Sequence, residues 1–385
     1  MALRPAGALA SRHCMRWSSR ALVAACVYAH GPGTWADEEP STYDRIWSHA
    51  TLYKDEGDGF VRSFALSGRL QFEVMYFDND EEDFDDTSWR RFRFGFKTKL
   101  AGDWVAQLEG DFDLNESSGD WYNRLTDAYI GWNPDDARDL RILKHSAGFT
   151  LDGATSSKKL LAMQRSNLTN NLWFTAEYFT GISLSGDTAD DWSYKAGLFS
   201  GDGDDEISIS DGSYFLLGSL GYDWARKLAM DRAKVRLDYV YNDRDPDNNT
   251  RDFSHVVSLS SQWEQGRWGL WTDLGAGEGY FDQSDVWGFS LMPFYRQSEL
   301  LQWVMRYTFI DSDEPNGVRL GRYHGEVTAG RGDRYEEIYL GLNLFFYGHR
   351  LKWQTGVEYA EMDDEATDGG KHEGWGATTG LRIYW

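Results

Sequence analysis

Apolar and polar residues alternate along most of the chain after residue 60. In the segment 64–76 the two faces of the pattern are occupied by separate sets of residues. The apolar set is Phe64, Leu66, Leu70, Phe72, Val74 and Tyr76, and the polar set is Ser67, Arg69, Gln71 and Glu73. A period of two residues is that of a β-strand with apolar surroundings on one face and polar surroundings on the other. The pattern therefore predicts a strand here.

The same alternation recurs as far as the last residue, Trp385. It is clear in the segments 91–100, 235–241, 301–309, 337–346, 351–359 and 377–385. We count roughly sixteen such strands after residue 60, each near the ten residues that cross a bilayer at a tilt. The sequence thus predicts an all-β fold, a transmembrane antiparallel β-barrel, in which the strand that ends at Trp385 pairs with the first strand.

The predicted connections alternate in length. One set is short, as in "AGD" after Leu100 and "QG" after Glu264. The other set is longer and acidic and comprises 78–87, 201–212, 311–332 and 362–373. This asymmetry is typical of outer-membrane barrels, whose short turns face the periplasm and whose long loops face outside. A soluble β-sandwich is the alternative, but it would bury Arg, Lys and Glu side chains in a dry core at high cost.

The N-terminal 36 residues have the features of a signal peptide. Four arginines precede the short apolar run "ALVAACVYA", and "TWA" offers small residues before Asp37, as a cleavage site requires. A lipoprotein-type cleavage that leaves a lipidated Cys26 is the alternative. We therefore expect a signal peptide over 1–36, a short periplasmic segment over 37–59 and the barrel over 60–385.

Composition and charge narrow the function. The chain has 62 acidic and 39 basic residues and a formal net charge of -23, whereas nucleic-acid binding needs clustered Lys and Arg. We expect no nucleic-acid partner. His145 and Ser146 are adjacent and so point to opposite faces of a strand, which excludes a direct nucleophile–base pair. We expect no enzymatic activity, cofactor or metal. The acidic run 78–86 is interpreted as a solvated loop, with a divalent-cation site as the alternative.

The longest connection in the first half of the chain carries recognisable motifs. It covers 146–171 and contains "TSS" at 155–157 and "MQRS" at 163–166. Flanking segments include "WRRFRFGFKTKLAGDW" from Trp89, "DAYIGW" from Asp127 and "GISLSG" from Gly181. With these motifs the chain resembles the phosphate-selective porin O and P family. It departs from the family pattern in reading "LKHS" at 143–146 and in having Gly148 where the family has proline.

The resemblance implies a passive porin in the outer membrane of a Gram-negative bacterium. Its solutes would be small and hydrophilic, or inorganic anions such as phosphate, and it would be a homotrimer whose loop 146–171 folds inward and narrows the channel. Other expected partners are membrane lipid, lipopolysaccharide and the insertion machinery, which reads a C-terminal aromatic strand such as the one ending at Trp385. A barrel that acts as a surface scaffold or adhesin, without an open channel, is the alternative.

Basic side chains are the candidate site residues. The wall candidates are Arg69, Arg91, Arg93, Lys97 and Lys99, and the candidates on the constriction loop are Lys158, Lys159 and Arg165. Two-residue spacing places successive charges about 7 Å apart, so that an anion can pass between them without being trapped. The alternative is that these cations pair with facing acids such as Glu73, Glu109 and Asp111. A preference for cations also stays open, because the chain is acidic overall.

Overall fold

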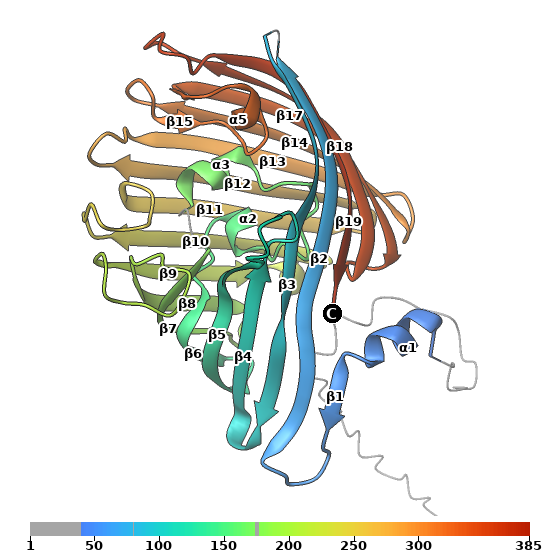
Figure 1. The fold of residues 1–385 in the computed structure, drawn as a ribbon. Helices are drawn as coiled ribbons and strands as arrows, with labels where there is room; N and C mark the ends of the chain where they lie inside the picture. Colours follow the sequence, from blue (N-terminus) through green and yellow to red (C-terminus); the bar gives the residue numbers. More distant parts are fainter. Residues whose placement is uncertain (1–39, 80, 174–176) are drawn as a thin grey trace, which may run out of the picture. The chain divides into compact units, whose positions relative to one another are not determined.

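The chain is described by a computed structural model that covers residues 40–79, 81–173 and 177–385. The predicted signal peptide over 1–36 therefore lies outside the described residues. Ser41–Trp385 form one compact unit, which consists mainly of β-strands (Figure 1). None of the helices within these described ranges has the length and apolarity needed to cross a membrane.

Sixteen antiparallel strands close into a barrel, which confirms the predicted fold. They are β2 (Val61–Asn79), β3 (Asp83–Leu100), β4 (Trp104–Phe112), β5 (Tyr122–Asp135), β6 (Arg138–Ser146), β7 (Tyr178–Asp187), β8 (Trp192–Ser200), β9 (Tyr214–Asp223), β10 (Arg232–Asn242), β11 (Phe253–Gln265), β12 (Trp268–Gly279), β13 (Val286–Arg296), β14 (Leu301–Ser312), β17 (Arg334–Tyr347), β18 (Leu351–Asp363) and β19 (His372–Tyr384). Strand β10 pairs with both β9 and β11, and β19 pairs with β2. Every strand of the barrel therefore has a neighbour on each side, as lipid requires of backbone polar groups.

The two faces of the barrel differ in polarity. Arg69, Gln71 and Glu73 of β2 are buried inside, whereas the alternating Val74 and Tyr76 are exposed outside. Other strands expose large apolar side chains as well: Leu108, Ile130, Leu216, Leu237, Leu274, Trp303, Leu340 and Val357. An apolar exterior around a polar interior is the arrangement of a barrel in lipid.

Strand β3 departs from the alternation at one residue. Its register with β2 shifts between Gln71 and Phe72, which leaves Arg90 as an extra residue. Such a bulge places two neighbouring side chains on the same face of a strand. Nε of Arg90 lies 3.5 Å from Glu73, and Nη1 of Arg91 donates to Gln71 Oε1 at 2.9 Å. Both arginines therefore point into the barrel.

Connections of two lengths alternate around the barrel. The short set includes the turn η1 (Ala101–Asp103) and the segments 266–267 and 348–350. The long set includes 113–121, 147–177, 201–213 and 313–333. The acidic run 78–86 differs from its interpretation as a loop, because most of it continues β2 and β3 as a hairpin with Asp78 opposite Asp83. Pairing satisfies the backbone groups of this hairpin without help from the barrel.

The N-terminal segment lies at the seam of the barrel. Its described part contains α1 (Thr42–Ser48) and β1 (Thr51–Lys54), which pairs with β2. The indole of Trp47 donates a hydrogen bond to the carbonyl of Tyr384 at 2.7 Å. The segment thus contacts both strands that close the barrel.

A Gly68→Ala substitution is expected to weaken this seam. A Cβ atom on Gly68 would lie 2.4 Å from the carbonyl oxygen of Arg93 and 2.6 Å from Cζ2 of Trp385, so the paired strands would have to move apart. Overpacking of this kind costs about 1–3 kcal/mol, which lowers the urea midpoint of unfolding measured by heat-modifiable electrophoretic mobility. The control is Gly218→Ala in β9, where a Cβ meets no described atom within 4 Å. Equal midpoints for the two variants would contradict the prediction.

Candidate functional site

A long connection between β6 and β7 folds into the barrel interior. Its described residues, 147–173 and 177, carry two short helices, α2 (Leu151–Ala154) and α3 (Asn167–Leu172), which lie among the strands in Figure 1. Helix α3 packs on β12, β13 and β14, and its Leu168 is fully buried. We call this connection the inner loop. It includes the predicted constriction loop 146–171 apart from Ser146, which ends β6.

Side chains of the wall hold the middle of the inner loop by its backbone. Four carbonyls accept hydrogen bonds: Leu160 from Lys352 Nζ at 2.6 Å, Leu161 from Asn343 Nδ2 at 2.9 Å, Met163 from Arg382 Nη2 at 3.2 Å and Gln164 from Arg306 Nη1 at 2.8 Å. The donors belong to β18, β17, β19 and β14. Since buried carbonyls need such donors, the polar wall residues fix the loop against a broad arc of the barrel.

Two carboxylates hold the beginning of the inner loop. The N–H of Thr150 donates to Asp238 Oδ2 of β10 at 2.9 Å, and the N–H of Leu151 donates to Asp273 Oδ2 of β12 at 2.8 Å. Both amides belong to the first turn of α2, where N–H groups have no partner inside the helix. Hydrogen bonds to ionised carboxylates are stronger than neutral ones, so this pair anchors the loop where it enters the interior.

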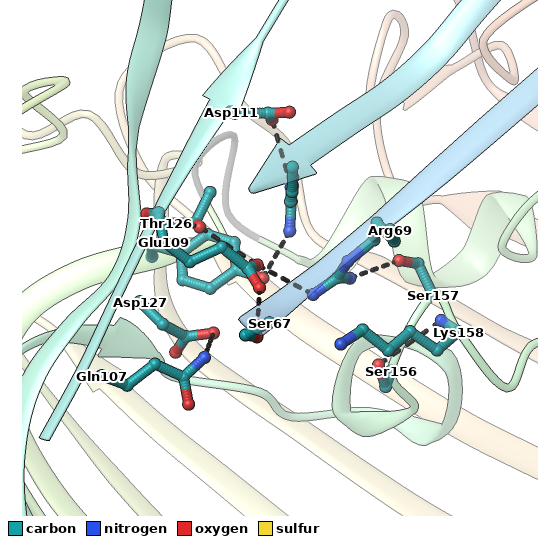
Figure 2. Close-up of polar contacts among 12 residues, drawn as sticks. Ser67, Arg69, Gln107, Glu109, Asp111, Thr126, Asp127, Ser156, Ser157 and Lys158 are labelled. Atoms are coloured by element: carbon teal, nitrogen blue, oxygen red, sulfur yellow. Dashed lines mark hydrogen bonds and ion pairs between the residues drawn. The ribbon is translucent and has the colours of Figure 1, made fainter. Parts of the chain in front are cut away.

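Arg69 connects the inner loop to the wall (Figure 2). Its Nη1 donates to Ser157 Oγ at 2.7 Å, and its Nη2 lies 3.2 Å from Glu109 Oε1. Glu109 also accepts a hydrogen bond from Ser67 Oγ at 2.8 Å. Lys158 is half-buried on the adjacent turn, with its Nζ 5.2 Å from the ring centre of Tyr384. The charge of Arg69 is therefore balanced by the facing acid.

Two further predicted cations share one carboxylate. Arg93 lies 3.3 Å from Asp111 and 3.8 Å from Glu177, and it donates to the Tyr178 hydroxyl at 2.5 Å. Arg165 lies 3.4 Å from the other oxygen of Glu177. The arrangement brings a wall strand and the inner loop together through Glu177.

These groups border a cavity of about 490 Å³. Its arginines are Arg90, Arg91, Arg93, Arg124, Arg165, Arg251 and Arg322, and its carboxylates are Asp111, Glu177 and Glu326. The seven arginines exceed the three carboxylates by four positive charges. A guanidinium is planar and binds two oxygens of a carboxylate or phosphate at once. The arginine-lined cavity is therefore suited to an anion.

Several donors in the arginine-lined cavity lack an acceptor. Among the described residues neither Arg91 nor Arg322 has an ion pair, and Arg91 donates only to the neutral Gln71. Nε1 of Trp173 is a further buried donor without a hydrogen-bond acceptor, whereas Nε of Arg90 lies 3.5 Å from Glu73, and Nε of Arg93 and Arg124 lie 3.3 and 3.8 Å from Asp111. A buried donor without an acceptor is costly. A bound anion would supply the missing acceptors.

The structure places three of the predicted site residues in this cavity, namely Arg91, Arg93 and Arg165. The others do not line it. Arg69 is paired with Glu109, Lys158 is half-buried beside that pair, and Lys97, Lys99 and Lys159 are exposed elsewhere on β3 and the inner loop. Of the predicted acids, Glu109 forms an ion pair with Arg69 and Asp111 forms one with Arg93.

Four arginines of the cavity are absent from the sequence prediction: Arg90, Arg124, Arg251 and Arg322. The signal for Arg90 is the pair of adjacent arginines in a strand that otherwise alternates. Arg251 and Arg322 come from long connections, and no local pattern shows that these connections fold inward. Within the described ranges, no group of three or more His, Cys, Asp or Glu side chains is arranged to hold a metal ion.

Comparison with known proteins identifies the family. The family model described as phosphate-selective porin O and P matches residues 64–271, just over half of the chain. The chain belongs to this porin family. The match runs from β2 to the start of β12, and therefore includes the inner loop and most arginines of the cavity.

Several solved structures share the fold of the porin. The anion-selective porin from Comamonas acidovorans matches with a TM-score of 0.60 at 14% identity, over 84% of this chain and 99% of that chain. OmpF of Salmonella typhi, solved as a complex with daunomycin, matches with 0.61 at 14% identity, over 87% and 100%. The outer membrane channel DcaP of Acinetobacter baumannii matches with 0.57 at 12% identity, over 86% and 99%. No curated protein matches the sequence.

Family and fold establish an outer-membrane porin, a channel for small solutes in the outer membrane of a Gram-negative bacterium. Proteins of this family and fold are channels rather than enzymes. The predicted channel function is confirmed, in preference to a surface scaffold or adhesin without an open channel.

Proposed function

We propose that the porin prefers anions, inorganic phosphate among them, and that the arginine-lined cavity selects them. The observation that supports this is the excess of four positive charges in a cavity of about 490 Å³. A unit charge at 4 Å changes the energy of an ion by about 1 kcal/mol even in water, so the cavity attracts anions and repels cations. Phosphate fits because each guanidinium binds two of its oxygens.

Other predicted cations extend the route of an anion beyond the arginine-lined cavity. Arg69 and Lys158 lie next to Glu109, and Lys97 and Lys99 follow along β3. Conduction requires sites that bind an ion well enough to admit it and weakly enough to release it. Glu109, the carboxylate beside Arg69, supports a role of this region in conduction, because it keeps the attraction for an anion moderate.

We also propose the orientation, the assembly and the export of the porin. The short turns face the periplasm and the long connections face outside, where lipopolysaccharide surrounds the barrel, and the active form is a homotrimer. Residues 1–36 are a signal peptide, and 37–59 stay at the periplasmic side. The insertion machinery reads the last strand, whose terminal Trp385 pairs through its backbone with Gly68 at 3.3 Å. The resemblance to the family and the alternating connection lengths support this orientation.

Recordings of the purified porin in planar bilayers test the anion preference. Under a gradient of potassium chloride we expect a reversal potential with the sign of chloride permeation. Added inorganic phosphate should reduce the chloride current, because the two anions compete for the same arginines. A reversal potential with the sign of potassium permeation would contradict the preference. A chloride current that phosphate leaves unchanged would remove phosphate from the proposal.

A further inference from the structure

The connection between β14 and β17 folds back toward the barrel wall. Residues 313–333 contain β15 (Val318–Arg319), α5 (His324–Val327) and β16 (Arg331–Gly332). Helix α5 packs on β2 and β3. The same connection contributes Arg322, which has no ion pair among the described residues, to the arginine-lined cavity. It also contributes Glu326, so the docked connection adds one cation and one carboxylate to the lining of that cavity.

A chain of hydrogen bonds through two imidazoles holds α5 in place. The side-chain N–H of Asn79 donates to Thr328 Oγ1 at 2.9 Å, and Thr328 Oγ1 lies 2.8 Å from Nδ1 of His372 on β19. Nε2 of His372 lies 2.9 Å from Nδ1 of His324, whose Nε2 lies 3.4 Å from Glu358 Oε1 on β18. With both imidazoles neutral, the hydrogen bonds run in one direction, from Thr328 to His372 and from His372 to His324, and the Nε2–H of His324 lies near Glu358 without a hydrogen bond to it. Both imidazoles are buried, with exposed fractions of 1% for His324 and 2% for His372.

Most charged groups around this chain of hydrogen bonds already form ion pairs with one another. Titratable groups on the surrounding elements include Glu73 on β2, Arg90 on β3, Arg306 on β14, Tyr335 and Glu337 on β17, Glu358 on β18, Arg382 on β19, and Arg322, Tyr323 and Glu326 on the connection itself. Glu73 lies 2.8 Å from Arg382, and Glu337 lies 2.7 Å from Arg306. Among the described residues, Glu358 is the carboxylate that contacts the imidazole pair.

We propose that acid releases the connection 313–333 from the barrel and removes Arg322 and Glu326 together from the lining of the arginine-lined cavity. The docked pair accepts at most one added proton, because one carboxylate balances one imidazolium. A second proton would place two buried cations in direct contact, with ring centres 4.8 Å apart. Once the connection is released, His324 on the connection and His372 on β19 both reach water, and each takes up a proton.

The sign of the pH dependence follows from this proton count. An imidazole in water has a pKa of about 6.5, so the released state binds one more proton than the docked state below that pH. Docking is therefore complete at neutral and higher pH and is lost as the pH falls. A difference of one proton changes the ratio of docked to released porin about tenfold per pH unit. Release carries both Arg322 and Glu326 away from the cavity, so the excess of four positive charges is kept.

Hydrogen exchange of residues 320–330, measured by mass spectrometry on the full-length porin in detergent, tests the release independently of channel activity. We expect protection of this segment at neutral pH and its loss about two units below the ordinary imidazole pKa, after correction for intrinsic exchange. His372→Gln keeps a neutral hydrogen-bonding side chain and should retain protection at the acidic pH. Glu358→Gln removes the counter-ion and should lose protection at a higher pH than the unaltered porin.

A matched control and a second readout complete the test. His255→Gln removes an imidazole that contacts Tyr239 on the neighbouring strand, and it should behave as the unaltered porin. The reversal potential in potassium chloride should stay unchanged over the pH range in which protection is lost, because the released connection takes one cation and one carboxylate out of the cavity lining. Protection that persists at acidic pH, or is lost equally in His372→Gln, would overturn the proposal. Lost protection with a reversal potential that shifts toward zero would contradict the joint removal of Arg322 and Glu326. A porin without anion preference at neutral pH would instead refute the proposed function, and the exchange result would still stand.

Discussion

The double variant R91E/R322E is expected to lose the anion preference of the porin and to conduct anions and cations about equally. Each substitution changes the charge of the arginine-lined cavity by two units, so the pair cancels its excess of four positive charges. At about 1 kcal/mol per unit charge at 4 Å in water, we expect the anion-to-cation permeability ratio to fall at least about tenfold, which corresponds to 1.4 kcal/mol. The reversal potential under a potassium chloride gradient measures this ratio.

Arg91 and Arg322 suit this experiment because neither has an ion pair among the described residues. Replacing Arg93 instead would remove one of the two arginine partners of Asp111 and of Glu177 and would confuse selectivity with stability. The control is R226E/K227E on α4 (Ala225–Leu228), an exposed turn between β9 and β10. It makes the same change in net charge outside the cavity. Equal shifts in the two double variants would show that the cavity does not select ions.

Removing the two carboxylates that anchor the inner loop is expected to raise the single-channel conductance. In D238A/D273A the amides of Thr150 and Leu151 lose their acceptors. Each hydrogen bond to a charged group contributes about 1.5–3 kcal/mol, so the entry of the loop is weakened enough to populate released forms. A loop that leaves the interior no longer narrows it. Conductance in planar bilayers should therefore increase, with larger fluctuations of the open current.

The matched control for the anchor is D223A/D231A. These carboxylates also accept backbone N–H groups, from Ala225 and Gly266, but they lie at the end of β9 and just before β10. The control therefore removes the same charge and the same kind of hydrogen bond without touching the inner loop. An unchanged conductance in D238A/D273A, or an equal increase in both double variants, would contradict the anchoring role.

The barrel itself is predictable from the sequence because lipid imposes a simple rule. Side chains that alternate in polarity, such as Val74 and Tyr76 against Gln71 and Glu73, identify a strand with two different faces. Backbone groups in lipid must pair, which predicts that the strand ending at Trp385 meets the first strand. The register from Tyr384 opposite Arg69 confirms this pairing.

The cavity is less predictable because its residues come from segments that no local pattern connects. Arg91 and Arg93 follow from alternation on β3, and Arg165 follows from the position of the inner loop. Arg251 and Arg322 enter only because two distant connections fold inward, and contacts at such separation leave no periodic signal in the sequence. The charge balance of the cavity was not predictable either, because Arg93 pairs with Glu177 of the inner loop, a contact that no local pattern shows.

Because of the bulge on β3, the charge of this strand can change without moving its other side chains between the interior and exterior faces of the barrel. Arg91 pairs with Gln71 and Trp89 pairs with Phe72, so the strand would alternate without interruption if Arg90 were missing. Deleting Arg90 should therefore remove one cation and keep every other side chain of β3 on its present face, whereas a deletion elsewhere in the strand would exchange the two faces. A change of one residue in chain length at this position is thus a route by which related channels can differ in charge while their barrels stay the same.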